Sequence, residues 1–327
     1  MRRRDFIAGL GSATVIRPVT ARAQQTTMPV IGMLSSAPFE SRKEQVLAFH
    51  RGLREAGYVE GQNVAVEYRS ADNQISRLPA LANDLVDRHV GVIATITGDI
   101  TAVVAKTATT TIPIVFVVGG DPVQRGLVAS LNRPGGNLTG VSFLVAATIA
   151  KRLEFLSQLM PTAATVGVLV NPDNPNADFS VRDAEESAPL LHKKLVIVRA
   201  ATDSDLDIPF RSFAQNKVDG VLIDADPFFL AKREQLVGLV AVHRMPAIYS
   251  FREFASSGGL MSYGTSLSNA YRQVGNYVGR ILKGEKPSEL PVMQSTKFDF
   301  VINLKTAQSL SIEFPAKLLV LADEVIE

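Results

Sequence analysis

The chain has 327 residues, with 34 Lys and Arg against 32 Asp and Glu, four His and no Cys. This length predicts about two domains, and a hydrophobic fraction of 46% excludes a disordered chain. The lack of Cys excludes disulfides, thiolate metal sites and a lipid anchor on an N-terminal Cys, and a net charge of +2 gives no basis for nucleic-acid binding.

The first residues have the layout of an export signal. Arginines occupy positions 2–4, residues 6–16 are short and uncharged, and residues 21–23 form a small-x-small cleavage site. Residues 3–7 (RRDFI) are similar to the twin-arginine signal. We therefore expect residues 1–23 to be a cleaved export signal, of twin-arginine type, with cleavage near Ala23 and Gln24 and a periplasmic mature protein. The alternative is a basic N-terminus on a cytoplasmic protein.

The first half of the remaining chain alternates strands and helices. Apolar or alternating runs predict strands at residues 30–35, 63–69, 91–96 and 112–118. Helical stripes lie between them, and the stripe in residues 42–56 stops at Gly57. Strands separated by helices of this length predict βαβ units and a parallel sheet.

The second half repeats this order. Strands are predicted at residues 166–170, 194–199, 220–223 and 246–249, and Gly or Pro residues recur at offsets of 129 to 135 residues. The repeat predicts two similar doubly wound α/β lobes. Extended segments at residues 138–143, 261–265 and 297–304 predict three hinge crossings. We expect an N-terminal lobe of residues 29–142 plus 264–294 and a C-terminal lobe of residues 143–263 plus 295–327.

Candidate binding residues follow the predicted strands. Ligands of open α/β sheets bind at the carboxyl ends of the strands, and in two facing lobes these ends converge on one cleft. Several residues in these positions could instead have a purely structural role. The polar ones could be helix N-caps (Ser36, Asp99, Asp173, Asp226), a turn former (Asp121) or a surface residue (Arg252). The aromatic ones could belong to the core (Phe228, Phe251, Tyr263). The candidates are Ser35, Ser36, Thr97, Gly98, Asp121, Asn171, Asp224, Asp226, Phe251, Arg252 and Tyr263.

Enzyme signatures are weak. The four His lie in helical or helix-ending segments, and no HExxH, GxSxG or Walker A pattern occurs. We expect no catalytic residue, no metal and no cofactor. A ligand-sensing regulator or an enzyme on the same two-lobe fold stays as the alternative, although the residues before Val30 contain no helix-turn-helix for DNA.

Six segments together resemble one branch of the ABC transporter substrate-binding proteins. They cover nearly all of the chain after the export signal, in order. The segments are residues 52–63 (GLREAGYVEGQN), 112–116 (IPIVF), 119–123 (GGDPV), 133–140 (RPGGNLTG), 281–287 (ILKGEKP) and 300–304 (FVINL).

The resemblance implies the type I periplasmic-binding fold, with two lobes, three crossings and a ligand in the cleft. It implies capture of a small solute, with some relatives associated with aromatic amino acids, and delivery to a cognate ABC permease with its ATPase. We expect a monomer without a stable membrane anchor. Residues 224–227 and 250–253 depart from the pattern of relatives, which leaves the solute open. In the second run Arg252 could clamp a carboxylate.

Overall fold

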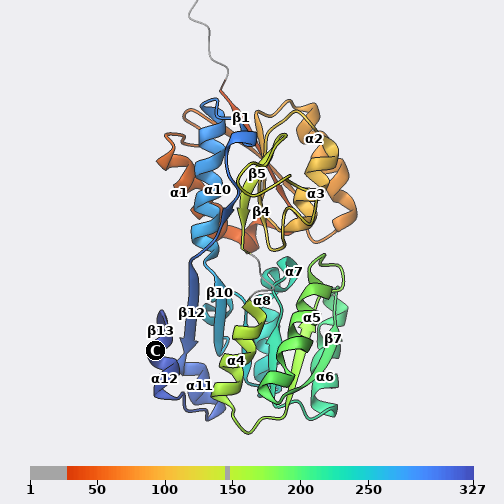
Figure 1. Ribbon diagram of the computed structural model, residues 1–327, viewed down its shortest axis with the longest axis vertical. Helices are drawn as coiled ribbons and strands as arrows, with labels where there is room; N and C mark the ends of the chain where they lie inside the picture. The colour runs from red at the N-terminus through yellow and green to blue at the C-terminus, as the bar shows by residue number, and fades with distance from the viewer. Residues whose placement is uncertain (1–27, 144–147) are drawn as a thin grey trace, which may run out of the picture.

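The computed structural model describes residues 28–143 and 148–327 (Figure 1). The chain forms two α/β lobes, one above the other in Figure 1, and each lobe is built on its own sheet. The two-lobe α/β fold expected from the sequence is confirmed. The expected export signal lies outside the described residues.

The first lobe has a parallel sheet in the order β11-β5-β4-β3-β1-β2. Its strands are β1 Val30–Ser35, β2 Ala65–Ser70, β3 Val92–Thr95, β4 Ile114–Val118, β5 Leu138–Ser142 and β11 Met293–Gln294.

Helices cover both faces of this sheet. They are α1 Lys43–Glu55 and α10 Leu267–Leu282 on one face, and α2 Leu78–Asp87 and α3 Asp99–Ala108 on the other (Figure 1). Strand β1 shows why both faces are apolar: Ile31 and Met33 pack with α1 and α10, whereas Leu34 packs with α2 and α3.

The second lobe has the sheet order β13-β12-β10-β9-β8-β6-β7, in which only the β10–β12 pairing is antiparallel among the described strand pairs. Its strands are β6 Thr165–Val170, β7 Lys194–Arg199, β8 Gly220–Ile223, β9 Ala247–Tyr249, β10 Met261–Thr265, β12 Phe298–Asn303 and β13 Glu324–Ile326.

Helices of the second lobe also occupy both faces of their sheet. Side chains of α4 and α5 share one apolar cluster with the sheet, and those of α6 and α8 share the other. The helices are α4 Ile149–Leu159, α5 Ala177–Ser187, α6 Asp207–Gln215, α7 Pro227–Ala231, α8 Arg233–Val242, α9 Arg252–Ser256, α11 Leu304–Leu310 and α12 Ala316–Leu321.

The repeat in the sequence corresponds to a repeat in structure. The order β2-β1-β3-β4 of the first sheet matches β7-β6-β8-β9 of the second. Gly32 and Gly167 hold equivalent places, since a Cβ on Gly32 would meet the side chain of Leu85 and one on Gly167 would meet the ring of Phe213. In both lobes the glycine lets a helix side chain lie directly on the central strand.

The chain passes between the sheets three times. The passages run from β5 to α4, from β10 to α10 and from β11 to β12 (Figure 1). The segment at residues 261–265, which the sequence suggested as a crossing, is a strand of the second sheet. The chain leaves the second lobe only after this strand. The segment at residues 297–304 likewise forms β12 of the second sheet.

Helices α1 and α10 pack in close contact. Gly52 of α1 lies against the carbonyl oxygen of Arg272, and Gly275 of α10 lies against that of Phe49, so a Cβ at either glycine would overlap backbone. This pair holds the start of α1 in place at the edge of the first lobe that faces the second.

Candidate functional site

A cavity of about 100 Å³ lies between the two lobes. A single water needs roughly 10–15 Å³, so the cavity has room for several waters or one small organic molecule. Residues that follow the carboxyl ends of strands in both sheets line it. They are Ser36, Thr97, Gly119 and Phe143 of the first lobe, and Asn171, Ala201, Ala225 and Phe251 of the second.

Six of the predicted binding residues line this cavity. Two of them connect neighbouring strand ends, because the backbone N–H of Ser36 donates to Oγ1 of Thr97 at 2.6 Å. The six are Ser36, Thr97, Gly98, Asn171, Asp226 and Phe251.

Three predicted residues are directed into their own lobe. Ser35 is buried and donates to the carbonyl oxygen of Ala37 at 2.5 Å. Asp121 accepts from the backbone N–H groups of the turn that it begins, the nearer at 2.8 Å. Tyr263 packs against Phe155 with ring centroids 5.1 Å apart. These three do not line the cavity.

Asp224 follows β8 as predicted but points into the core of the second lobe. There it lies 3.5 Å from the guanidinium of Arg152, whose side chain is fully buried on α4. Arg152 also donates to the carbonyl oxygen of Ile223 and to the hydroxyl of Ser250. It therefore joins the ends of β8 and β9, from which the cavity residues Asp226 and Phe251 continue.

Arg252 also lies away from the cavity. Its guanidinium forms an ion pair with Glu324 of β13, with a shortest N···O distance of 2.6 Å. The pair borders a second, charged groove between the lobes, lined also by Glu44 of α1 and Arg272 of α10. The expected carboxylate clamp is thus already paired with a carboxylate of its own lobe.

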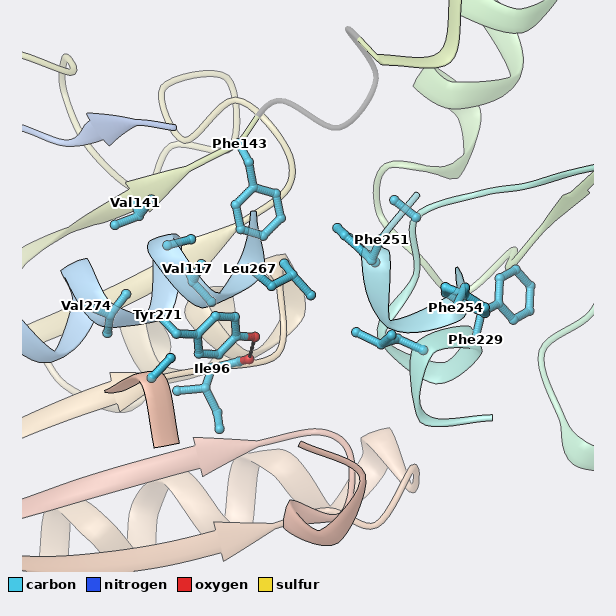
Figure 2. Close-up of a cluster of buried hydrophobic side chains, with 14 of the residues drawn as sticks. Ile96, Val117, Val141, Phe143, Phe229, Phe251, Phe254, Leu267, Tyr271 and Val274 are labelled. Carbon is cyan, nitrogen blue, oxygen red and sulfur yellow. Dashed lines mark hydrogen bonds between the residues drawn. The ribbon is translucent and has the colours of Figure 1, made fainter. Parts of the chain in front are cut away.

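Aromatic side chains form the apolar part of the cavity. Phe143 of the first lobe faces Phe251 of the second, with ring centroids 6.4 Å apart and an interplanar angle of 80° (Figure 2). Phe228 and Tyr271 also line the cavity, and the hydroxyl of Tyr271 donates to the carbonyl oxygen of Ile96. Such walls suit a planar apolar group.

Two buried acids lie in the lining. Asp226 caps α7 by accepting from the N–H of Phe229 at 3.0 Å, and it also accepts from Asn171 and Asn174. Burial raises the pKa of Asp226 to about 6. Its role as a helix cap, the alternative considered from the sequence, is therefore confirmed, although it faces the cavity as well.

Asp99 bridges several loops. Its carboxylate accepts from the N–H groups of Gly119 and Gly120, at 3.0 and 3.2 Å, and from the amide of Asn176 at 3.0 Å. A Cβ on Gly120 would overlap the side-chain oxygens of Asp99 and Asn176, so a substitution here must displace these two groups.

The lobes touch through polar contacts around the cavity. Arg42 donates from Nη2 to the carbonyl oxygen of Pro227 at 2.6 Å, and Gln45 donates to Glu253 at 2.7 Å. These contacts join the two lobes across the cleft. Four further lining residues do not directly follow a strand: Arg42, Asn73, Asn174 and Asn176. The expectation that ligand contacts follow strand ends, which we call the strand-end rule, therefore did not include them.

The described residues contain neither a metal-binding cluster nor a membrane-spanning helix. Within residues 28–143 and 148–327, no group of three or more His, Asp and Glu side chains is placed to hold a metal ion. In the same part of the chain, no helix has the length and apolar character needed to span a bilayer.

Two facing α/β lobes with a cavity at their strand ends define the type I periplasmic-binding fold. A family model described as ABC transporter substrate binding protein matches residues 30–326. The chain belongs to this family, which confirms the resemblance seen in the sequence.

The chain is similar to proteins from several bacteria. A tyrosine-binding protein of Clostridioides difficile (strain R20291) is 26% identical over 283 residues, which are 86% of this chain and 81% of the relative. A conserved domain protein from Vibrio cholerae O1 biovar El Tor has 27% identity and a TM-score of 0.84. An ABC domain from Streptococcus pneumonia in complex with L-Trp has 25% identity and a TM-score of 0.82. Both alignments cover 91% of this chain and 99% of the other.

Proposed function

We propose that this substrate-binding protein is the extracytoplasmic component of an ABC importer, which captures a small solute between its lobes. The observation that carries the proposal is the cavity between the lobes, lined by strand ends of both sheets. The captured solute passes to a cognate permease and its ATPase. Residues 1–23, with their arginines and small-residue cleavage site, support export to the periplasm.

The proposed mechanism is closure about the three passages between the lobes. The lobes meet through side chains around the cavity, such as Phe143 against Phe251 and Arg42 on Pro227, while each sheet keeps its own helices, so the closed arrangement can open without unfolding either lobe. A ligand held by both lobes shifts the population towards the closed form, because it gains contacts to the second lobe only there. We keep the lobes predicted from the sequence, residues 29–142 plus 264–294 and 143–263 plus 295–327, but assign residues 264 and 265 to the second lobe because β10 ends at Thr265. The proposed protein is a monomer.

The proposed solute is an amino acid or a related carboxylate with an aromatic body. Support comes from Phe143, Phe228 and Phe251 in the lining and from the tyrosine and tryptophan named for two relatives. The predicted residues that we keep as ligand contacts are Ser36, Thr97, Gly98, Asn171, Asp226 and Phe251.

The test is thermal and chemical unfolding of the mature protein with a panel of amino acids, aromatic carboxylates, amines and sugars. A ligand at 100 times its Kd is expected to stabilise the protein by about 2.7 kcal/mol. If a folded protein responds to no panel member and carries no co-purified ligand, the proposal fails. Turnover of a bound compound would indicate an enzyme instead, and a retained Met1 in N-terminal sequencing of the native protein would contradict export.

A further inference from the structure

Arg42 is a buried cation at the boundary of the two lobes. It ends the short 3-10 helix Phe39–Arg42 of the first lobe, is 2% exposed and lines the cavity. Its Nη2 donates to the carbonyl oxygen of Pro227 in the second lobe, at 2.6 Å. Its Nε is buried and has no hydrogen-bond partner.

The charge of Arg42 lacks a close counter-ion. In the described part of the chain no carboxylate lies within 4 Å of its guanidinium, and Glu253 and Asp226 act on it at longer range. Glu253 accepts from Gln45 instead. A buried guanidinium without an anion costs several kcal/mol, and arginine does not escape this cost by losing its proton.

The buried acids of the lining are in the opposite situation. Asp99 accepts from two backbone N–H groups and from Asn176, and Asp226 accepts from one backbone N–H and from two asparagine amides. Protein donors therefore already satisfy both carboxylates. The cavity therefore contains a buried cation without a close anion, whereas each of these two acids already accepts three hydrogen bonds from protein donors.

We propose that the ligand carries a carboxylate that pairs with Arg42, and that an ammonium group on the ligand is dispensable. This inference rests on the proposed function and narrows its solute class to carboxylates with an apolar, ring-sized body. The guanidinium of Arg42, which lines the cavity, donates to the carboxylate while Nη2 stays on Pro227. Closure over a neutral or cationic solute would leave Arg42 buried without an anion, so the anion also favours closure.

The experiment is calorimetric titration with three compounds that share one ring: L-tyrosine, 3-(4-hydroxyphenyl)propionate without the ammonium, and tyramine without the carboxylate. A parallel set is L-tryptophan, indole-3-propionate and tryptamine. In at least one set the propionate is expected to bind within about tenfold of the amino acid, and the amine about 100-fold more weakly. An amine that binds as tightly as its amino acid, or a propionate that does not bind, overturns the inference.

Variants test the residue itself. Arg42→Met is expected to weaken carboxylate binding about 100-fold, with partial recovery in Arg42→Lys. Arg233→Met is the matched control, because Arg233 also reaches across the lobes, to the carbonyl oxygen of Ser41, but does not line the cavity. Equal loss of affinity in the Arg42→Met and Arg233→Met proteins would show that Arg42 has no special role.

Two outcomes distinguish failure of the carboxylate inference from failure of the proposed solute capture. If only sugars or amines of the wider panel bind, solute capture stands and the carboxylate inference fails. If nothing binds, the thermal stability of the ligand-free variants still tests whether Arg42 has a structural role. We expect Arg42→Met to unfold at the same or a higher temperature than wild type, because it removes an uncompensated buried charge. A fall larger than that of Arg233→Met would assign Arg42 to structure and overturn the inference.

Discussion

The carboxylate of Asp99 accepts a hydrogen bond of 3.0 Å from the amide of Asn176, and the two residues belong to different lobes. Arg125 of the first lobe completes this contact. It donates to Oδ1 of Asn176 at 2.8 Å and to the carbonyl oxygen of Pro175, and its guanidinium lies 5.5 Å from the centre of the Phe179 ring. We call Asp99, Arg125 and Asn176 the inter-lobe latch.

Removal of the latch arginine should weaken ligand binding although Arg125 does not line the cavity. In the proposed closure, Arg125→Met removes the inter-lobe bonds to Asn176 and Pro175, so the closed form loses about 1–2 kcal/mol and Kd rises about five- to thirtyfold. Stopped-flow release measurements should show faster dissociation.

Arg88→Met is the control for the latch, since Arg88 pairs with Asp84 within the first lobe. Its Kd should match that of wild type. An unchanged Kd in the Arg125→Met protein would show that the latch does not contribute to capture.

Asp226 should make stability depend on pH. Burial raises its pKa in the folded protein to about 6, against 3.8 for an ordinary Asp, so folding favours the protonated form. Its contribution to the free energy of unfolding is therefore fully present below about pH 4. This contribution, up to about 3 kcal/mol, is lost as the pH rises through 6.

Urea unfolding between pH 4 and 8 measures this effect. The unfolding free energy of wild type should fall with rising pH relative to that of Asp226→Asn, which keeps an oxygen for the N–H of Phe229. Parallel pH profiles for the two proteins would show that Asp226 does not titrate in this way.

Two glycine substitutions should have opposite effects on stability. Gly52→Ala places a Cβ on the carbonyl oxygen of Arg272 and must push α1 and α10 apart, which we expect to cost a few kcal/mol, roughly the scale of overpacking. Gly238→Ala on the exposed side of α8 meets no atom within 4 Å and should stabilise by about 1 kcal/mol through helix propensity. Equal unfolding midpoints for the two variants would contradict the described packing.

The strands were predictable because their signal is local. Residues 30–35 and 194–199 form β1 and β7 with the expected bounds, and Gly57 ends α1 with a positive φ of 90°. The short helices α7 and α9 and the strand β11 escaped prediction, because five or fewer residues give no periodicity.

The site was predictable only in part, for a physical reason. The strand-end rule found Ser36, Asn171 and Phe251, since chain direction alone brings them to the cleft. It placed Arg252 there too, but α9 directs that side chain to Glu324, which lies 72 residues further along the chain. Arg42 was missed because its place in the cavity depends on how one lobe meets the other, which no local pattern records.

The most direct test of capture by closure uses the absence of Trp from the chain. Phe251→Trp introduces a single indole that faces Phe143 of the other lobe in the closed form. Its fluorescence should be recorded during titration with a non-fluorescent carboxylate that calorimetry shows to bind. We expect a blue shift that saturates with the calorimetric Kd, because closure removes the indole from water. Binding without any change in emission would contradict capture between closing lobes.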